Sequence, residues 1–237
     1  MALPQVNNSR YEVVIPSTGQ KVSYRPYLVK EEKVLMMAME SNDSKMIMNA
    51  TIDIIKACVF DDINIDELAM FDIETLFVAL RAKSVGERID LSVKCDECDG
   101  RNDIQIDFDD IKTPEVKETE SVIMITDKVG VTMRYPSYSD IAEIDGNNKE
   151  DVDINAALKV IVACIKNIFD EDAVYDAKNE TKKSLTDFVE SLSNAQFIKL
   201  SQFFSESPAL TYDLKYDCMH CKTHNETELK GLQSFFT

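Results

Sequence analysis

The sequence contains no apolar run approaching the roughly 20 residues that a membrane-spanning helix requires. Its first residues, 1–5, do not combine a charged stretch with an apolar one, as a secretory leader does. We therefore expect a protein without a membrane-spanning segment, which stays in the cytoplasm where it is made.

Motifs of the common enzyme classes are also missing. The sequence has no Walker loop, no G-x-S-x-G, no Rossmann glycine fingerprint and no H-E-x-x-H. Its six glycines leave little material for phosphate-binding loops. Acidic runs such as Asp61-Asp62 and Asp170-Glu171-Asp172 are more typical of helix caps and solvated surfaces than of acid–base catalysis. We predict no enzyme, no catalytic residues and no residues that bind an organic cofactor.

Basic residues are scarce relative to acidic ones. The chain has 26 Lys and Arg residues against 43 Asp and Glu, a formal net charge of −17. Such a surface repels phosphate backbones and anionic lipid head groups, so nucleic acid and membranes are not expected partners. With 44% hydrophobic residues in 237, the chain has enough apolar material for a substantial core.

Strand-like and helix-like segments follow one another in an order that occurs twice. The first half is predicted to contain strands at 12–15 and 21–25, helices at 30–39, from an N-cap at Ser44 through Cys58, and from 72 to 86, and a β-hairpin at 89–94 and 104–108. The second half is predicted to contain strands at 122–125 and 131–135, helices at 139–144, 154–169, 184–192 and 195–204, and a β-hairpin at 212–216 and 227–232. Ala163-Cys164 in the second half corresponds to Ala57-Cys58 in the first.

This order predicts an α+β fold built from two pseudo-repeated halves, 1–112 and 120–237, joined by a charged linker near 112–120. The second half is longer, and its extra residues are expected in the polar segment 170–183. Cys58, at a helical spacing from other apolar residues, is expected in the core.

Each half is predicted to end in a hairpin with a Cys-x-x-Cys tip, Cys95 to Cys98 and Cys218 to Cys221. Zn(II) prefers four soft ligands in a tetrahedron, and two such tips supply four thiolates. We predict one structural zinc ion on Cys95, Cys98, Cys218 and Cys221, which joins the two halves in a zinc-ribbon-like site. The alternatives are four ordinary free thiols, or a site in which His220 or His224 replaces one cysteine.

Residues beside the cysteines fit the same interpretation. Gly100 lies where a turn can require a positive φ. The basic residues Lys94, Arg101, Lys215 and Lys222 could offset the net charge of −2 that four thiolates leave on Zn(II). A redox role is the less favoured reading of the Cys-x-x-Cys pairs, because that motif begins a helix in thioredoxin-like proteins.

Methionines concentrate in one region, at positions 36, 37, 39, 46 and 48. Methionine fills irregular gaps in cores, which is the expected role here; an exposed cluster would instead make an adaptable docking surface.

One segment carries a family resemblance. Val14-Ile15-Pro16-Ser17-Thr18-Gly19, followed by Val22-Ser23-Tyr24-Arg25-Pro26-Tyr27-Leu28-Val29-Lys30-Glu31-Glu32-Lys33-Val34-Leu35-Met36-Met37-Ala38, resembles the baseplate proteins of T-even-type contractile-tailed bacteriophages. The resemblance implies a baseplate hub subunit or hub assembly chaperone, a late viral protein. Its implied partners are other hub and tail proteins, in the host cytoplasm during assembly and in the virion baseplate. A zinc-ribbon nucleic-acid adaptor and a thiol redox protein are the alternative functions.

Overall fold

A computed structural model of the chain describes residues 8–41, 43–113, 116, 121–145 and 154–235. Contacts divide the chain into two compact units, which are described separately. The first unit comprises Met1–Ile65, Phe71–Glu115 and Ala209–Thr237, and the second comprises Asp66–Met70 and Val116–Pro208. The C-terminal hairpin therefore packs with the N-terminal part of the chain. Most of the predicted linker, 114–115 and 117–120, lies outside the described residues.

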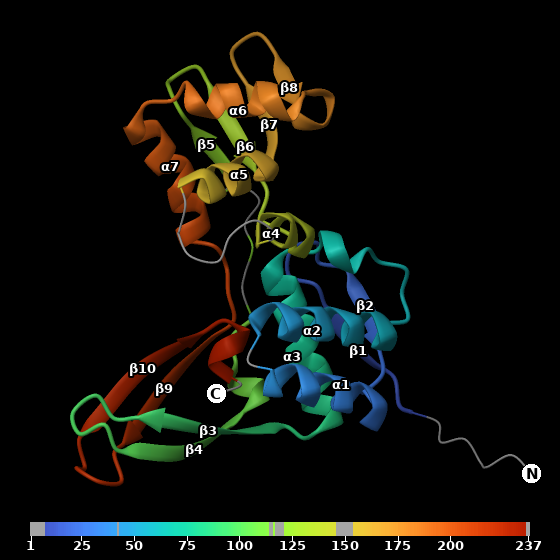
Figure 1. The fold of residues 1–237 in the computed structure, drawn as a ribbon, viewed down its shortest axis with the longest axis vertical. Helices are drawn as coiled ribbons and strands as arrows, with labels where there is room; N and C mark the ends of the chain where they lie inside the picture. Colours follow the sequence, from blue (N-terminus) through green and yellow to red (C-terminus); the bar gives the residue numbers. More distant parts are fainter. Residues whose placement is uncertain (1–7, 42, 114–115, 117–120, 146–153, 236–237) are drawn as a thin grey trace, which may run out of the picture. The chain divides into compact units, whose positions relative to one another are not determined.

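The first unit begins with a hairpin and a group of helices (Figure 1). Strands β1 (Tyr11–Val14) and β2 (Lys21–Tyr24) pair antiparallel. They precede α1 (Val29–Glu40), α2 (Ser44–Cys58) and α3 (Met70–Ser84). The 3-10 turn η1 (Ile65–Glu67), which precedes α3 in the chain, has two of its three residues in the second unit. Cys58 is fully buried, as predicted from its spacing.

The start of α2 differs from the prediction by one residue. Asp43 is the N-cap, and its carboxylate accepts hydrogen bonds from the backbone N–H groups of Lys45, at 2.9 Å, and Met46, at 3.3 Å. Ser44 is the first residue of the helix instead of its cap. Asp and Ser are comparably good N-caps, so only the chain geometry distinguishes these neighbours.

Two long hairpins complete the first unit (Figure 1). Strands β3 (Arg88–Lys94) and β4 (Arg101–Asp107) form one, and β9 (Thr211–Asp217) and β10 (His224–Lys230) form the other. Short 3-10 turns follow them, η2 (Phe108–Asp110) and η5 (Leu232–Phe235). Lys112 and Thr211 exchange backbone hydrogen bonds at 2.8 and 3.2 Å, which fixes the base of one hairpin near the base of the other.

The second unit packs helices on a four-stranded antiparallel sheet. The strand order is β5 (Val122–Met124), β6 (Gly130–Met133), β7 (Ile165–Phe169) and β8 (Val174–Asp176). The helices are α4 (Tyr138–Asp145), α5 (Ile154–Cys164), α6 (Lys182–Glu190) and α7 (Asn194–Ser205), with a 3-10 turn η4 (Ala177–Asn179). Val131, Met133, Ile161, Cys164 and Leu200 form the centre of its core.

The predicted helix 154–169 is wrong in its last part. The helix ends at Cys164, and Ile165–Phe169 forms β7, which pairs with β6 on one side and β8 on the other. Ile165, Ile168 and Phe169 are β-branched or aromatic and favour a strand once partner strands are present. The polar segment 170–183 is not a plain loop, since it contains β8 and η4.

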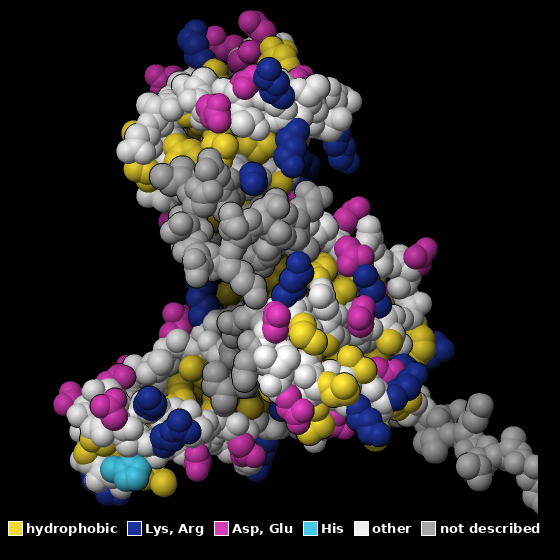
Figure 2. All heavy atoms as spheres, in the orientation of Figure 1, with side chains coloured by type: hydrophobic (Ala, Val, Ile, Leu, Met, Phe, Trp, Pro, Cys, Tyr) yellow, Lys and Arg dark blue, Asp and Glu magenta, His cyan; other side chains and the backbone are white. Residues whose placement is uncertain are grey.

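None of the five clustered methionines is fully buried, since Met39 and Met48 are intermediate in exposure and the other three are exposed. Met36, Met37 and Met46 are 59%, 71% and 51% exposed, so the core interpretation is wrong for them. Figure 2 shows apolar side chains gathered on the face of the first unit that carries α1 and α2. Among the residues the structure describes, no helix has the length and apolar character needed to cross a membrane.

Candidate metal centre

The two Cys-x-x-Cys turns have the same backbone geometry. In the β3–β4 turn, the Cys95 N–H donates to Gly100 O and the Asp99 N–H donates to Cys95 O, both at 3.0 Å. In the β9–β10 turn, the Cys218 N–H donates to Thr223 O at 2.9 Å and the Lys222 N–H donates to Cys218 O at 3.0 Å. Each turn thus folds back onto its first cysteine.

The left-handed residue of each turn directly follows the second cysteine. Asp99 has φ 55° and Lys222 has φ 65°. The expectation that Gly100 supplies the positive φ is therefore wrong. Gly100 is needed for space: a Cβ there would lie 2.9 Å from Cγ of His220 and 3.1 Å from Sγ of Cys98. The imidazole of the opposite turn packs directly on this glycine.

The four cysteine sulfurs converge where the hairpin tips meet. Sγ of Cys95 lies 3.6 Å from Sγ of Cys221. Sγ of Cys98 lies 3.7 Å from Sγ of Cys218, and all four sulfurs lie within 4.8 Å of one another. Tetrahedral bonds of about 2.3 Å would separate sulfurs by about 3.8 Å. The four cysteines are therefore placed closely enough to hold one metal ion.

The pairing of the sulfurs is crossed. The first cysteine of each turn contacts the second cysteine of the other, and the first cysteines, Cys95 and Cys218, are buried while Cys98 and Cys221 are exposed. The two turns are thus related by an approximate two-fold arrangement around the sulfur cluster.

Backbone N–H groups favour thiolates at this site. Contacts with the backbone of Cys221 and His220 lower the pKa of Cys218 to about 6, and the His220 N–H lies 3.4 Å from its sulfur. The Gly100 N–H favours the Cys98 thiolate, but contacts with the sulfurs of Cys221 and Cys218 outweigh it and raise the Cys98 pKa to about 12. Four thiolates this close repel one another, so a cation is needed before all four lose their protons.

The predicted basic residues flank the cluster. Lys94 and Arg101 are the last pair of opposite residues in the β3–β4 hairpin. Lys222 is the residue with left-handed backbone conformation in the β9–β10 turn. Lys215 pairs with Glu226 at 2.9 Å, so part of its charge is already balanced.

Neither histidine belongs to the group of metal-ligating atoms found among the described residues. The His220 Nε2–H donates to Arg101 O at 2.9 Å. His224 Nδ1 lies 2.9 Å from the carboxylate of Asp217. The imidazoles therefore support the hairpins around the sulfurs.

Two asparagines of the site were not predicted. Asn102 and Asn225 are 1% and 5% exposed, and each hydrogen-bonds to the backbone of the opposite turn. A signal was present in the sequence, because both turns read Cys-x-x-Cys-x-x-x-Asn. Both turns also lie at hairpin tips, unlike a thioredoxin-type motif at a helix start.

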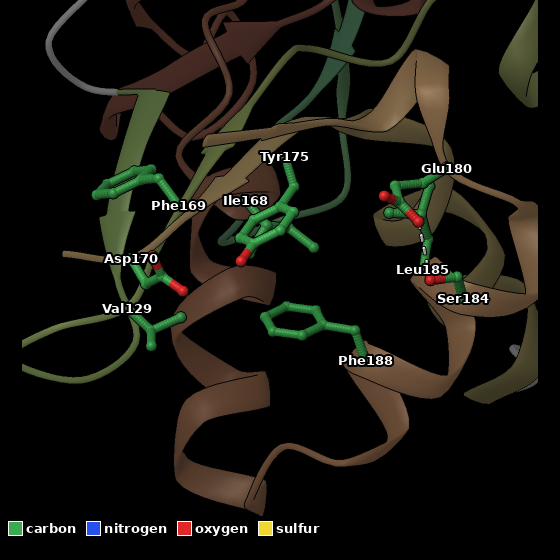
Figure 3. Close-up of a pocket in the computed structure, with 9 residues that line it drawn as sticks. All are labelled: Val129, Ile168, Phe169, Asp170, Tyr175, Glu180, Ser184, Leu185 and Phe188. Carbon is green, nitrogen blue, oxygen red and sulfur yellow. Dashed lines mark hydrogen bonds between the residues drawn. The ribbon is translucent and has the colours of Figure 1, made fainter. Parts of the chain in front are cut away.

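A separate hollow of about 390 Å³ lies in the second unit (Figure 3). Tyr175 and Phe188 face each other across it. Its carboxylates are hydrogen-bonded within the chain. Asp170 accepts from the N–H groups of Asp172 and Ala173, and Glu180 accepts from the Ser184 hydroxyl. Figure 3 shows Asp170 and Glu180 on opposite sides of the hollow.

The fold and the site define a mixed helix-and-strand protein with a four-cysteine cluster able to hold a metal ion. Residues 8–237, nearly the whole chain, match the family described as T4 bacteriophage base plate protein. The chain belongs to this family, which confirms the resemblance seen in the N-terminal segment. No curated protein and no solved structure gives a match.

Proposed function

We propose that the protein is a baseplate hub component or hub assembly chaperone that acts through protein–protein contacts and without catalysis. The family match over residues 8–237 carries this proposal. The finer assignment to the hub follows the resemblance of the N-terminal segment. The protein would meet its partners, other hub and tail proteins, in the host cytoplasm and pass with them into the virion baseplate or leave after assembly.

The exposed face of α1 and α2 is the proposed contact surface. Val34, Met36, Met37 and Met46 are each about half exposed or more. Methionine side chains adapt their shape to a partner more readily than branched ones do, which suits a protein that joins successive assembly intermediates. The charge of −17 would direct the chain toward basic partner surfaces.

Sedimentation of tail-assembly intermediates tests the hub assignment. A tagged chain from phage-infected cells should co-sediment with a baseplate hub intermediate, and Met36→Ser with Met37→Ser should weaken this association. Val174→Ser provides a control, because Val174 is 69% exposed but lies on β8. A chain that always sediments as a solitary monomer would contradict the proposal.

We also propose that Cys95, Cys98, Cys218 and Cys221 hold a structural Zn(II). The sulfur spacing and the N–H groups directed at the sulfurs support this assignment. When bound, the ion supplies a cross-link between the hairpins worth on the order of 10 kcal/mol to folding. In this proposal the four thiolates occupy all four coordination positions of the ion.

Elemental analysis of freshly purified protein tests the metal. It should give about one zinc per chain, which Cys98→Ser should reduce strongly. Cys58→Ala is the matched control, since Cys58 is buried in the core and should leave the zinc content unchanged. Protein purified without any bound metal that also takes up none would refute the site.

A further inference from the structure

Asn102 and Asn225 hold equivalent places in the two hairpins. Each lies four residues after the second cysteine of its own turn, on the strand that leads away from the tip. Each is also buried, although asparagine is usually a surface residue. Both carboxamides therefore need hydrogen-bond partners inside the structure.

Each carboxamide connects its own turn with the opposite one. The Asn102 Nδ2–H donates to Gly100 O at 2.9 Å, and Asn102 Oδ1 accepts from the Met219 N–H at 2.7 Å. The Asn225 Nδ2–H donates to Thr223 O at 2.9 Å, and Asn225 Oδ1 accepts from the Asp96 N–H at 3.3 Å. Each asparagine thus bonds to the backbone of its own turn and to the backbone of the opposite turn.

The N–H groups that they hold are those next to the buried cysteines. Met219 follows Cys218, and Asp96 follows Cys95. A backbone held at this residue fixes the direction in which the preceding cysteine presents its sulfur. Asn102 has one more contact, because its Nδ2 lies 3.7 Å from Sγ of Cys218.

We propose that Asn102 and Asn225 are positioning residues, which hold each Cys-x-x-Cys turn against the other and thereby preorganise the sulfur cluster for its metal ion. This inference rests on the proposed metal site. Groups that orient metal ligands without binding the metal typically contribute 10–100-fold to metal affinity. Asn102, with the shorter bond to the opposite turn and the contact with sulfur, contributes more than Asn225.

Competition with a chromophoric chelator measures the zinc affinity of the full chain and its variants. Asn102→Ala should lower the affinity about 10–100-fold, and Asn225→Ala should lower it less. Gln105→Ala is the matched control: this carboxamide lies on the same strand as Asn102 but, among the described residues, bonds within its own hairpin, to Arg88 and Asp90.

Cobalt(II) substitution gives a second readout. The wild-type chain should show intense thiolate-to-metal charge-transfer bands and tetrahedral d–d bands, whereas Asn102→Ala should shift or weaken them at saturating metal. Unchanged affinity and unchanged spectra in both asparagine variants would overturn the positioning role. A larger loss in Gln105→Ala than in Asn102→Ala would also overturn it.

Amide hydrogen exchange is measured on the wild-type chain, so this test does not depend on whether a variant folds. The Met219 and Asp96 amides should exchange slowly, both with metal and after its removal by a chelator. Fast exchange of both amides in both states would overturn the proposal. If the wild-type chain takes up no metal while these amides are protected, the zinc assignment fails and the contact between the turns stands.

Discussion

Arg134 makes the same contacts in the second unit that Arg25 makes in the first. The Arg25 guanidinium donates to Ala57 O at 3.0 Å, and the Arg134 guanidinium donates to Ala163 O at 2.7 Å. Each backbone N–H donates to the carbonyl of the following cysteine, at 3.1 and 2.8 Å. Both arginines thus follow a strand and satisfy carbonyl groups at the C-terminus of a helix.

The acidic partners of the arginines also correspond. Arg25 pairs with Glu31 at 3.0 Å, and Arg134 pairs with Asp140 at 2.6 Å, six residues ahead in each case. These contacts support the proposal that 1–112 and 120–237 are two pseudo-repeated halves. The two compact units do not coincide with these halves. The C-terminal β9–β10 hairpin packs beside β3–β4 and so belongs to the first unit.

Removal of either arginine should destabilise the protein. Arg25→Ala removes one of the donors to the carboxylate of Glu31, which is 8% exposed and keeps its contacts with Lys30 and the Leu28 N–H, and it removes the donor to Ala57 O, so we expect a loss of about 1–3 kcal/mol in the free energy of unfolding. Arg134→Ala should cost less, because the Arg134 side chain is 42% exposed. Urea unfolding measures both. Arg88→Ala, which removes an exposed ion pair with Asp107, should change little; equal losses for all three variants would contradict this account.

Asp140 should contribute to loss of stability in acid. Burial alone would raise its pKa, but hydrogen bonds from Arg134 and Ser137 outweigh burial and hold the pKa below its ordinary value of 3.8. A folded-state pKa below the unfolded one stabilises the protein above pH 3.8, and this contribution is lost as the pH falls through the folded pKa.

Urea unfolding between pH 3 and pH 6 measures this contribution of Asp140 to the free energy of unfolding. Asp140→Asn should be less stable than wild type near pH 6 and should lose less stability on acidification. Glu228→Gln, at an exposed position on β10, should keep the wild-type pH dependence. Identical slopes for Asp140→Asn and wild type would show that Asp140 does not contribute.

The six thiols should react in two groups. Cys58 and Cys164 are fully buried, and burial raises their pKa values to about 11 and about 12. With a disulfide reagent, the metal-loaded chain should show slow reaction of all six. A chelator should release the four cluster cysteines, and the remaining two should react only after unfolding. Rapid reaction of the cluster thiols before chelation would contradict a bound metal.

Local patterns in the sequence predicted most elements because the hairpins and amphipathic helices are encoded by residues close together in the chain. The prediction failed at Ile165–Phe169, where the choice of strand depends on pairing with β6, more than 30 residues away. The apolar residues of this segment fit a helix or a strand equally well until that partner is known.

The four ligand candidates could be predicted because Cys-x-x-Cys spacing on a hairpin is a local property. The crossed pairing, in which Cys95 contacts Cys221, depends on how two hairpins meet and could not be read from either one. The same holds for Gly100, whose local surroundings gave no sign of the His220 ring.

Gly100 and His220 should be coupled energetically. Gly100→Ala places a methyl group against the His220 ring and 3.1 Å from Sγ of Cys98, so it should push the turns apart and lower both zinc affinity and thermal stability. His220→Ala alone should cost little, since it removes an exposed ring and one hydrogen bond to Arg101 O.

The double variant decides whether the ring causes the effect of Gly100→Ala. Adding His220→Ala to Gly100→Ala should restore part of the affinity, because the closest obstacle is gone while the contact with the Cys98 sulfur remains. A double-mutant cycle on zinc affinity and melting temperature should therefore give a favourable coupling between the two substitutions. Strictly additive losses would mean that Gly100 acts through its backbone and that the imidazole of the opposite turn is not packed on it.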